Sequence, residues 1–254
     1  MRFSEFASRF LLVRKCASCG ELLPYESKDE AFCGECRIKW DVEKTRECGV
    51  CGRSVCECVC MTKALSDAGA ICHRKAVFYS SSRPAVHNTL MFIKHNKNPR
   101  VTAFLASQLA AILRSDKDIP ELCADNYVIT FVPRGRRAVI EKGFDQSELL
   151  VRALSEKLGI PWAITLRRKR GGREQKKLNA SQRVRNVKGL FEPVAALEET
   201  VGGKRIILVD DIVTTGASMA ACISYLTRAG ARETVCLSVA STENTKSNKK
   251  LSCN

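Results

Sequence analysis

Hydrophobic positions along the last three quarters of the chain follow two different spacings. Apolar residues recur every three or four positions after Pro84, after Pro99 and again over 146–158 and 217–229, which predicts amphipathic helices there. Between these helices lie short apolar runs without polar alternation, as expected for strands that are covered on both faces. The expected strands are 76–79, 127–132, 163–166, 205–209 and 234–239. Helices that alternate with such strands predict an α/β domain with a mainly parallel sheet flanked by helices.

The first quarter of the chain has a different composition. Nine of the fourteen cysteines fall between Cys16 and Cys60, where large apolar residues are few. A segment this short buries too little apolar surface to fold by itself, so we expect another stabilising element. We therefore divide the chain into an N-terminal helix and cysteine-rich module over 1–62, an α/β domain over 63–241 and a polar tail over 242–254.

The apolar runs also bear on where the protein acts. None approaches the roughly 18 residues that would span a bilayer. The run 10–13 lies between Arg9 and Arg14 and is shorter than the apolar core of ~7 to 15 residues that export needs. We therefore expect a cytoplasmic protein without a membrane span. A reducing compartment favours metal binding over disulfides for the cysteines.

Most of these cysteines occur in pairs that suit a metal. Two Cys-x-x-Cys hooks separated by a short loop supply four thiolates at tetrahedral reach, which is typical of a structural zinc ribbon. The first predicted zinc site is Cys16, Cys19, Cys33 and Cys36. The second uses Cys48 and Cys51 with two of Cys56, Cys58 and Cys60, and we favour Cys56 and Cys58. An iron–sulfur cluster is the alternative, because spacing does not separate it from zinc. The three histidines, His73, His87 and His95, lack metal spacing and are expected at the surface.

The segment after the strand at 205–209 carries the most specific chemistry. Two acids, Asp210 and Asp211, end the strand, and a polar turn leads into the next helix. This turn consists of Thr214, Thr215, Gly216, Ala217 and Ser218. Strand ends line the ligand crevice of open α/β sheets, and free amides at a helix start bind phosphate. The acids would face neutral hydroxyls or Mg²⁺. The loop therefore fits a ribose 5-phosphate, and the alternative is that its polar residues merely cap the helix.

The run from Ile206 to Ser218 resembles the 5-phosphoribosyl diphosphate (PRPP) signature of the type I phosphoribosyltransferases. This resemblance implies that Asp210 and Asp211 hold the ribose hydroxyls and that the turn from Thr214 to Ser218 holds the 5-phosphate. Members specific for hypoxanthine and guanine have an aspartate where this chain has Thr214, so their substrate is not expected here.

Two basic segments suit the diphosphate of PRPP. The strand at 127–132 runs into Pro133-Arg134-Gly135-Arg136-Arg137, whose cations and backbone amides can neutralise a diphosphate. A solvated basic turn is the alternative. Residues 167–188 contain ten basic residues and one acid. A mobile lid, a strip that follows DNA or RNA phosphates and a disordered charged loop all fit this second segment. The formal charge of the whole chain, +15, predicts a polyanionic partner.

The order of these features resembles that of the ComF family of bacterial proteins. The cysteine-rich module is followed by the Pro-Arg turn, a Gly-Phe-Asp-Gln segment at 143–146, a basic stretch at 183–191 and the Asp-Asp loop. Family members usually have asparagine where this chain has Asp145, and Lys94 lies near the lysine of their Leu-Lys-Tyr segment. The family is linked to DNA uptake in natural transformation and is regarded as a group of predicted phosphoribosyltransferases.

The resemblance implies a type I phosphoribosyltransferase-like fold with a small N-terminal zinc ribbon module. We expect a PRPP-binding protein that uses Mg²⁺ with PRPP and transfers ribose 5-phosphate to an unknown nitrogen acceptor. Asp210 and Asp211 would be its catalytic residues, and Arg134, Gly135 and Arg136 would contact PRPP. Because no base-recognition motif is visible, the alternative is a non-catalytic PRPP sensor or a single-stranded DNA-binding factor that works with the DNA-uptake machinery.

Overall fold

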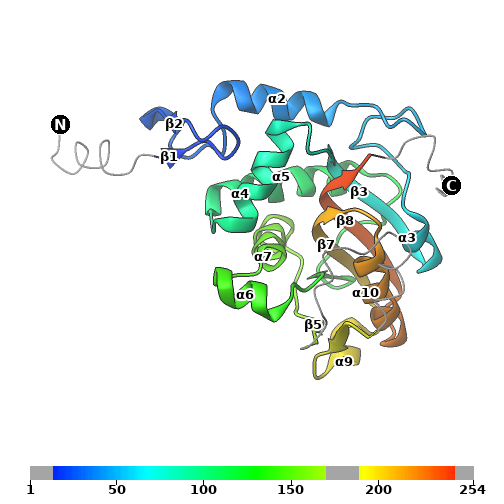
Figure 1. Ribbon diagram of the computed structural model, residues 1–254. Coiled ribbons are helices and arrows are strands. Elements are labelled where there is room, and N and C mark those ends of the chain that lie inside the picture. The colour runs from blue at the N-terminus through cyan, green and yellow to red at the C-terminus, as the bar shows by residue number, and fades with distance from the viewer. Residues whose placement is uncertain (1–13, 170–188, 244–254) are drawn as a thin grey trace.

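A computed structural model describes residues 14–169 and 189–243 as an α/β fold around one parallel sheet (Figure 1). The sheet has four strands in the order β3-β8-β7-β4, and β1-β2 and β5-β6 form two small antiparallel pairs. None of the helices in these ranges is long and apolar enough to cross a membrane. In chain order the elements are β1 (Arg14–Lys15), β2 (Leu22–Leu23), η1 (Tyr25–Ser27), α2 (Gly34–Lys44), α3 (Lys63–Asp67), β3 (Ala70–Tyr79), α4 (Pro84–His95), α5 (Pro99–Ser115), β4 (Tyr127–Phe131), α6 (Arg136–Lys142), α7 (Gln146–Leu158), β5 (Leu166–Arg168), β6 (Phe191–Pro193), α9 (Leu197–Val201), β7 (Arg205–Val213), α10 (Ala217–Arg228) and β8 (Glu233–Thr242).

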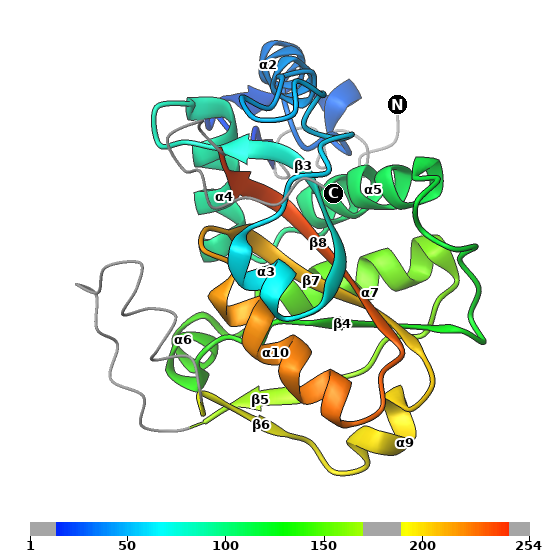
Figure 2. The ribbon, with the colours of Figure 1, turned by 90° about the vertical axis from the view of Figure 1, so that its right-hand side faces the viewer.

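Successive residues of the central strands pack on opposite faces of the sheet. Ile129 and Ile207 belong to the buried cluster that includes residues of α4, α5 and α7. Val128 and Ile206 belong to a second cluster, which includes residues of α3 and α10. Figure 2 shows α3 and α10 in front of the sheet, with α5 and α7 behind it. The absence of polar alternation in these strands follows from this double cover, and the predicted α/β class with a parallel sheet is confirmed.

The long helices begin and end where the sequence provides local signals. Pro84 and Pro99 occupy the first turns of α4 and α5, where a missing N–H costs nothing. The side chain of Asn98 caps α5 by accepting a hydrogen bond from the backbone N–H of Val101 at 3.2 Å. Gly159 adopts the left-handed conformation that closes α7. These signals explain why the predicted helix limits agree with the structure to within a residue or two.

The cysteine-rich segment packs on the α/β core through aromatic side chains. Trp40 of α2 is fully buried and stacks on Phe32, with ring centroids 5.6 Å apart. Phe104 of α5 meets Phe32 edge to face at 5.0 Å and Trp40 at 5.7 Å. Part of the apolar core of the cysteine-rich segment is thus supplied by α5 of the α/β domain.

Two expectations from the sequence are wrong in detail. The expected strand at 163–166 instead begins at Leu166 as β5, which pairs with β6 outside the main sheet. This region meets the sheet at an isolated parallel bridge between Trp162 and Ile129. There the N–H of Ile129 donates to the backbone oxygen of Pro161 at 2.9 Å, and its oxygen accepts the N–H of Ala163 at 3.0 Å. His73, expected at the surface, is buried in β3 with its Nε2 2.9 Å from Ser238 Oγ. Burial, together with the nearby positive charges of β3, holds the pKa of His73 well below its usual value, so it stays neutral.

Candidate functional site

The polar turn after β7 lies at the carboxyl edge of the sheet, as the sequence indicates. Thr214 is exposed, Gly216 has φ +74°, and α10 begins at Ala217. A small cavity of about 40 Å³ is lined by Asp210 and by residues 212–219. The hydroxyl of Thr215 accepts a hydrogen bond from the N–H of Ala217 at 3.4 Å, while the N-cap residue itself, Gly216, has no side chain to cap the helix. The remaining polar groups of the turn surround the cavity, where an anion can meet the helix N-terminus.

The two acids Asp210 and Asp211 lie within β7, which extends to Val213, beyond the expected strand at 205–209, and their electrostatic settings differ. Asp211 is buried and forms an ion pair with Arg134, and Lys94 Nζ lies 3.9 Å from the same carboxylate oxygen. Asp210 accepts a hydrogen bond from the backbone N–H of Asp211 at 2.9 Å. Burial and the neighbouring charge of Asp211 raise the pKa of Asp210 well above its usual value. The structure therefore places two carboxyl groups and two cations at one edge of the sheet.

Lys94 is the residue of this group that motif spacing alone does not reveal. It lies near the C-terminus of α4, and its backbone oxygen accepts a hydrogen bond from Lys142 Nζ at 2.9 Å. The only sequence signal for it was the resemblance to the Leu-Lys-Tyr segment, which gave no contact. The fold brings it to Asp211 because α4 packs in the same buried cluster as residues of β4 and β7, among them Phe131 and Val209.

The basic turn after β4 is held by Asp145. The carboxylate of Asp145 accepts hydrogen bonds from the N–H of Arg134 at 2.9 Å and from the N–H of Ser147 at 3.0 Å. Burial raises the pKa of Asp145, while these backbone N–H groups act in the opposite direction. Asp145 therefore caps α7 and fixes the turn instead of facing outward as a free negative charge. Arg136 begins α6 and is exposed.

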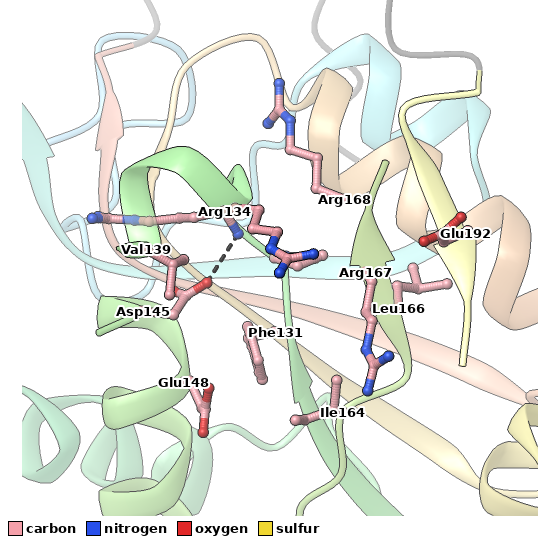
Figure 3. A pocket seen from close by; sticks show the side chains of 12 residues that line it. Phe131, Arg134, Val139, Asp145, Glu148, Ile164, Leu166, Arg167, Arg168 and Glu192 are labelled. Carbon is pink, nitrogen blue, oxygen red and sulfur yellow. Dashed lines mark hydrogen bonds between the residues drawn. The ribbon is translucent and has the colours of Figure 1, made fainter. Parts of the chain in front are cut away.

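A pocket of about 580 Å³ opens beside this turn. Figure 3 shows Phe131 of β4 in its centre, with Glu148 of α7 on one side and Ile164 and Arg167 on the other. Arg168 points away from Phe131 in the same view. The pocket has an apolar floor and a charged rim, and it adjoins the Arg134–Asp211 ion pair through Arg134. Most of the basic segment 167–188 lies outside the described residues.

The first cysteine quartet is assembled in the structure. The sulfur atoms of the set lie within 4.8 Å of one another. The set is Cys16, Cys19, Cys33 and Cys36. Burial acts to raise the pKa of Cys16, but backbone N–H groups of Cys19, Cys33 and Ser18 outweigh it and lower that pKa to about 7. Four soft sulfur donors at this separation fit a tetrahedral metal ion.

The second quartet differs from the predicted set at one position. The sulfur atoms within 4.8 Å of one another are those of Cys48, Cys51, Cys58 and Cys60. Cys56 lies inside a tight turn, and its sulfur lies 3.6 Å from the backbone oxygen of Ala76 instead. Cys58 and Cys60 follow this turn in a segment without regular secondary structure, and both sulfur atoms lie near those of Cys48 and Cys51. Cys60 therefore replaces Cys56 among the residues that could hold a metal.

Comparisons with known proteins show which proteins the chain is similar to. Residues 145–252 match the family model of the phosphoribosyl transferase domain. The DNA utilization protein YhgH of Salmonella typhimurium is 29% identical over 214 residues, 79% of this chain and 92% of that protein. YhgH of Escherichia coli K12 is 40% identical over 106 residues, 41% of this chain and 44% of that protein. The allosteric regulatory enzyme of purine biosynthesis, a solved structure, aligns with 59% of this chain and 30% of its own at 21% identity and TM-score 0.37.

The chain thus contains a phosphoribosyltransferase domain, with the parallel sheet and helices of that class. Ahead of the domain stand two cysteine quartets. Together with the relatives above, this arrangement confirms the predicted resemblance to the ComF family.

Proposed function

We propose that this protein binds PRPP together with Mg²⁺ at the carboxyl edge of its sheet and transfers ribose 5-phosphate to a nitrogen acceptor. The observation that carries the proposal is the arrangement around β7. There the polar turn at the start of α10 follows the end of β7, which contains Asp210 and Asp211, and Arg134 from the β4 turn forms an ion pair with Asp211. This edge of the sheet therefore offers groups that suit the 5-phosphate, the ribose diol and the diphosphate of PRPP.

Each group has a role that follows from its position. The backbone N–H groups at the start of α10, with the hydroxyls of Thr214, Thr215 and Ser218, would hold the 5-phosphate. Asp210 and Asp211 would accept hydrogen bonds from the ribose hydroxyls. Arg134, the backbone of Gly135, and Arg136 would contact the diphosphate, whose remaining charge Mg²⁺ would neutralise.

The ion pair between Arg134 and Asp211 sets a condition on binding. These two side chains serve different parts of PRPP, yet in the structure they bind each other. PRPP binding must therefore exchange this pair for contacts with diphosphate and ribose. In the transfer, the acceptor nitrogen forms a bond to the anomeric carbon, and the bond from this carbon to the diphosphate oxygen breaks with its electron pair. The acceptor nitrogen then loses its proton.

A calorimetric titration with PRPP and Mg²⁺ tests the site. Wild type should bind, and Asp211→Asn should bind about tenfold or more weakly, because charge-assisted hydrogen bonds to the ribose are lost. Asp116→Asn is a matched control, since Asp116 is also a buried acid paired with an arginine, Arg74, but lies away from this edge. It should bind PRPP as wild type does. No binding by wild type would refute the PRPP site, and diphosphate release over a panel of bases would test transfer.

The two cysteine quartets are proposed to hold one structural zinc ion each. Their all-sulfur donor sets and separations suit zinc, and the segment has too few apolar residues to fold without a cross-link. An iron–sulfur cluster is the rival, which the absorption spectrum of the purified protein would reveal. Metal-bound thiolates require a reducing compartment, which supports a cytoplasmic location.

Single-stranded DNA binding is the second candidate function. Its support is the +15 charge of the chain and the name of the relatives, which are DNA utilization proteins. Arg168 is exposed in part and lies at the edge of the basic segment. Binding should weaken steeply with salt, and Arg168→Glu should reduce the salt slope by about one or more. Binding that does not change with salt would contradict this candidate.

A further inference from the structure

We propose that the second cysteine quartet holds the phosphate-binding turn in shape through the segment from Cys60 to Leu65, in which Thr62 and Leu65 are positioning residues. The inference rests on the proposed function, because it assumes that Cys48, Cys51, Cys58 and Cys60 bind metal and that the turn at Gly216 binds the 5-phosphate. It adds that these two sites, in separate parts of the sequence, are mechanically connected.

The first link joins the quartet to strand β3. Lys75 is 1% exposed, and its Nζ donates a hydrogen bond to the backbone oxygen of Cys60 at 2.8 Å. Within the described residues, no carboxylate lies within ion-pair distance of Lys75, so the backbone oxygen of Cys60 is the acceptor that its buried Nζ finds. Phe78 of β3 packs in one small buried cluster with Cys48, Cys58 and Cys60. A metal ion at this quartet would therefore fix Cys60 against the edge strand of the sheet.

The second link joins Cys60 to helix α3. Only Met61 and Thr62 separate Cys60 from the first residue of this helix. The backbone oxygen of Thr62 accepts the N–H of Leu65 at 3.0 Å, which sets the first turn of α3. Met61 packs against the same buried cluster to which Leu65 belongs. With so few residues between them, a displacement of Cys60 must displace the start of α3.

The third link joins α3 to the phosphate-binding turn. Figure 2 shows α3 beside α10, and fully buried Leu65 shares a cluster with Ala217 and Met219 of α10. A methyl group added at Gly216 would lie 2.9 Å from Leu65 Cγ, and closer still to Thr62 Oγ1. The backbone of the turn at Gly216 is therefore packed closely against Thr62 and Leu65. Thr62 Oγ1 is buried without a hydrogen-bond partner, so shape, not polarity, determines this contact.

Loss of this support should weaken phosphate binding without removing any group that touches the ligand. If α3 moves away, Gly216 and its neighbours gain backbone freedom that binding must then remove. The first quartet offers the natural comparison. Its Cys16 and Cys36 pack in the cluster on the other face of the sheet, away from α3 and α10.

Cysteine substitutions in the full chain test the connection. Cys51→Ser and Cys19→Ser should each lower the zinc content from two ions per chain to one. Cys51→Ser should raise the Kd for PRPP with Mg²⁺ about tenfold or more, and should increase amide hydrogen exchange over 214–218. Cys19→Ser should leave both readouts unchanged. Equal Kd values for the two variants would overturn the inference.

A packing variant keeps the inference testable if Cys51→Ser does not fold. Leu65→Ala should retain both zinc ions and still weaken PRPP binding, whereas Leu109→Ala, at a fully buried position of α5, should leave the Kd unchanged. If Leu65→Ala binds PRPP as wild type does, the inference fails while the PRPP site stands. If wild type itself binds no PRPP, it is the proposed function that fails.

Discussion

Replacing Gly216 by alanine is expected to abolish PRPP binding and to lower the free energy of unfolding by about 2–6 kcal/mol. Gly216 has φ +74°, and left-handed backbone costs an alanine about 1–3 kcal/mol. The new Cβ would also lie 2.9 Å from Leu65 Cγ, and an overpacked contact of this kind adds about 1–3 kcal/mol. The turn or α3 must shift to relieve the overlap, and the backbone amides then no longer point at one phosphate.

Gly203→Ala separates these two costs. Gly203 has φ +69°, similar to Gly216, but no atom lies within 4 Å of an added methyl group. This variant should lose only about 1–3 kcal/mol and bind PRPP normally. Urea denaturation and calorimetric titration measure both effects. An equal loss of stability in the two variants, or unchanged PRPP binding in Gly216→Ala, would show that the contact with α3 does not shape the turn.

Local sequence signals were sufficient for the elements that form the sheet. The central runs of β4 and β7 lack polar alternation, because both their faces are covered. The strand expected at 163–166 was wrong because its neighbour is β6, some twenty-five residues later, and not the central sheet. Nothing in a short apolar run states which strand will pair with it, since pairing is a long-range property.

In the candidate site, too, the sequence predicted local features but not long-range contacts. The polar turn at Gly216 was evident from contiguous residues, because a single strand-turn-helix unit contains it. The ion pair between Arg134 and Asp211 joins residues 77 positions apart, and no sequence pattern indicated it. For Asp145, the sequence suggested an effect that the fold removes. Its charge, read from sequence alone, would oppose a diphosphate, but the fold directs it to the N–H groups of its own loop.

The second cysteine quartet shows how a turn can alter a spacing argument. Cys56, Cys58 and Cys60 alternate along the sequence, and in a continuous strand all three would share one face. The tight turn over 55–57 removes Cys56 from this alternation, and only Cys58 and Cys60 remain on the side of Cys48. Hence the correct pair depended on where the turn over 55–57 ends.

Removal of zinc by a chelator under reducing conditions is expected to unfold the cysteine-rich segment around Trp40. Structural zinc contributes about 10–16 kcal/mol in small zinc-binding peptides, more than the apolar contacts of so short a segment supply. Trp40 is fully buried between Phe32 and Phe104, so its fluorescence should shift to the red as water reaches the ring. A Trp162→Phe background leaves Trp40 as the single tryptophan. Added zinc should restore the original emission.

The metal content of two cysteine variants gives the matched control. Cys56 lies outside both quartets, so Cys56→Ser should keep two zinc ions per chain, whereas Cys60→Ser should keep one. Because Trp40 lies on α2, which begins directly after Cys33, its emission should follow the first quartet and stay unshifted in Cys60→Ser. A zinc-free chain with unshifted Trp40 emission would mean that the aromatic contacts with α5 suffice to fold the segment, and the metal would then have no structural role there.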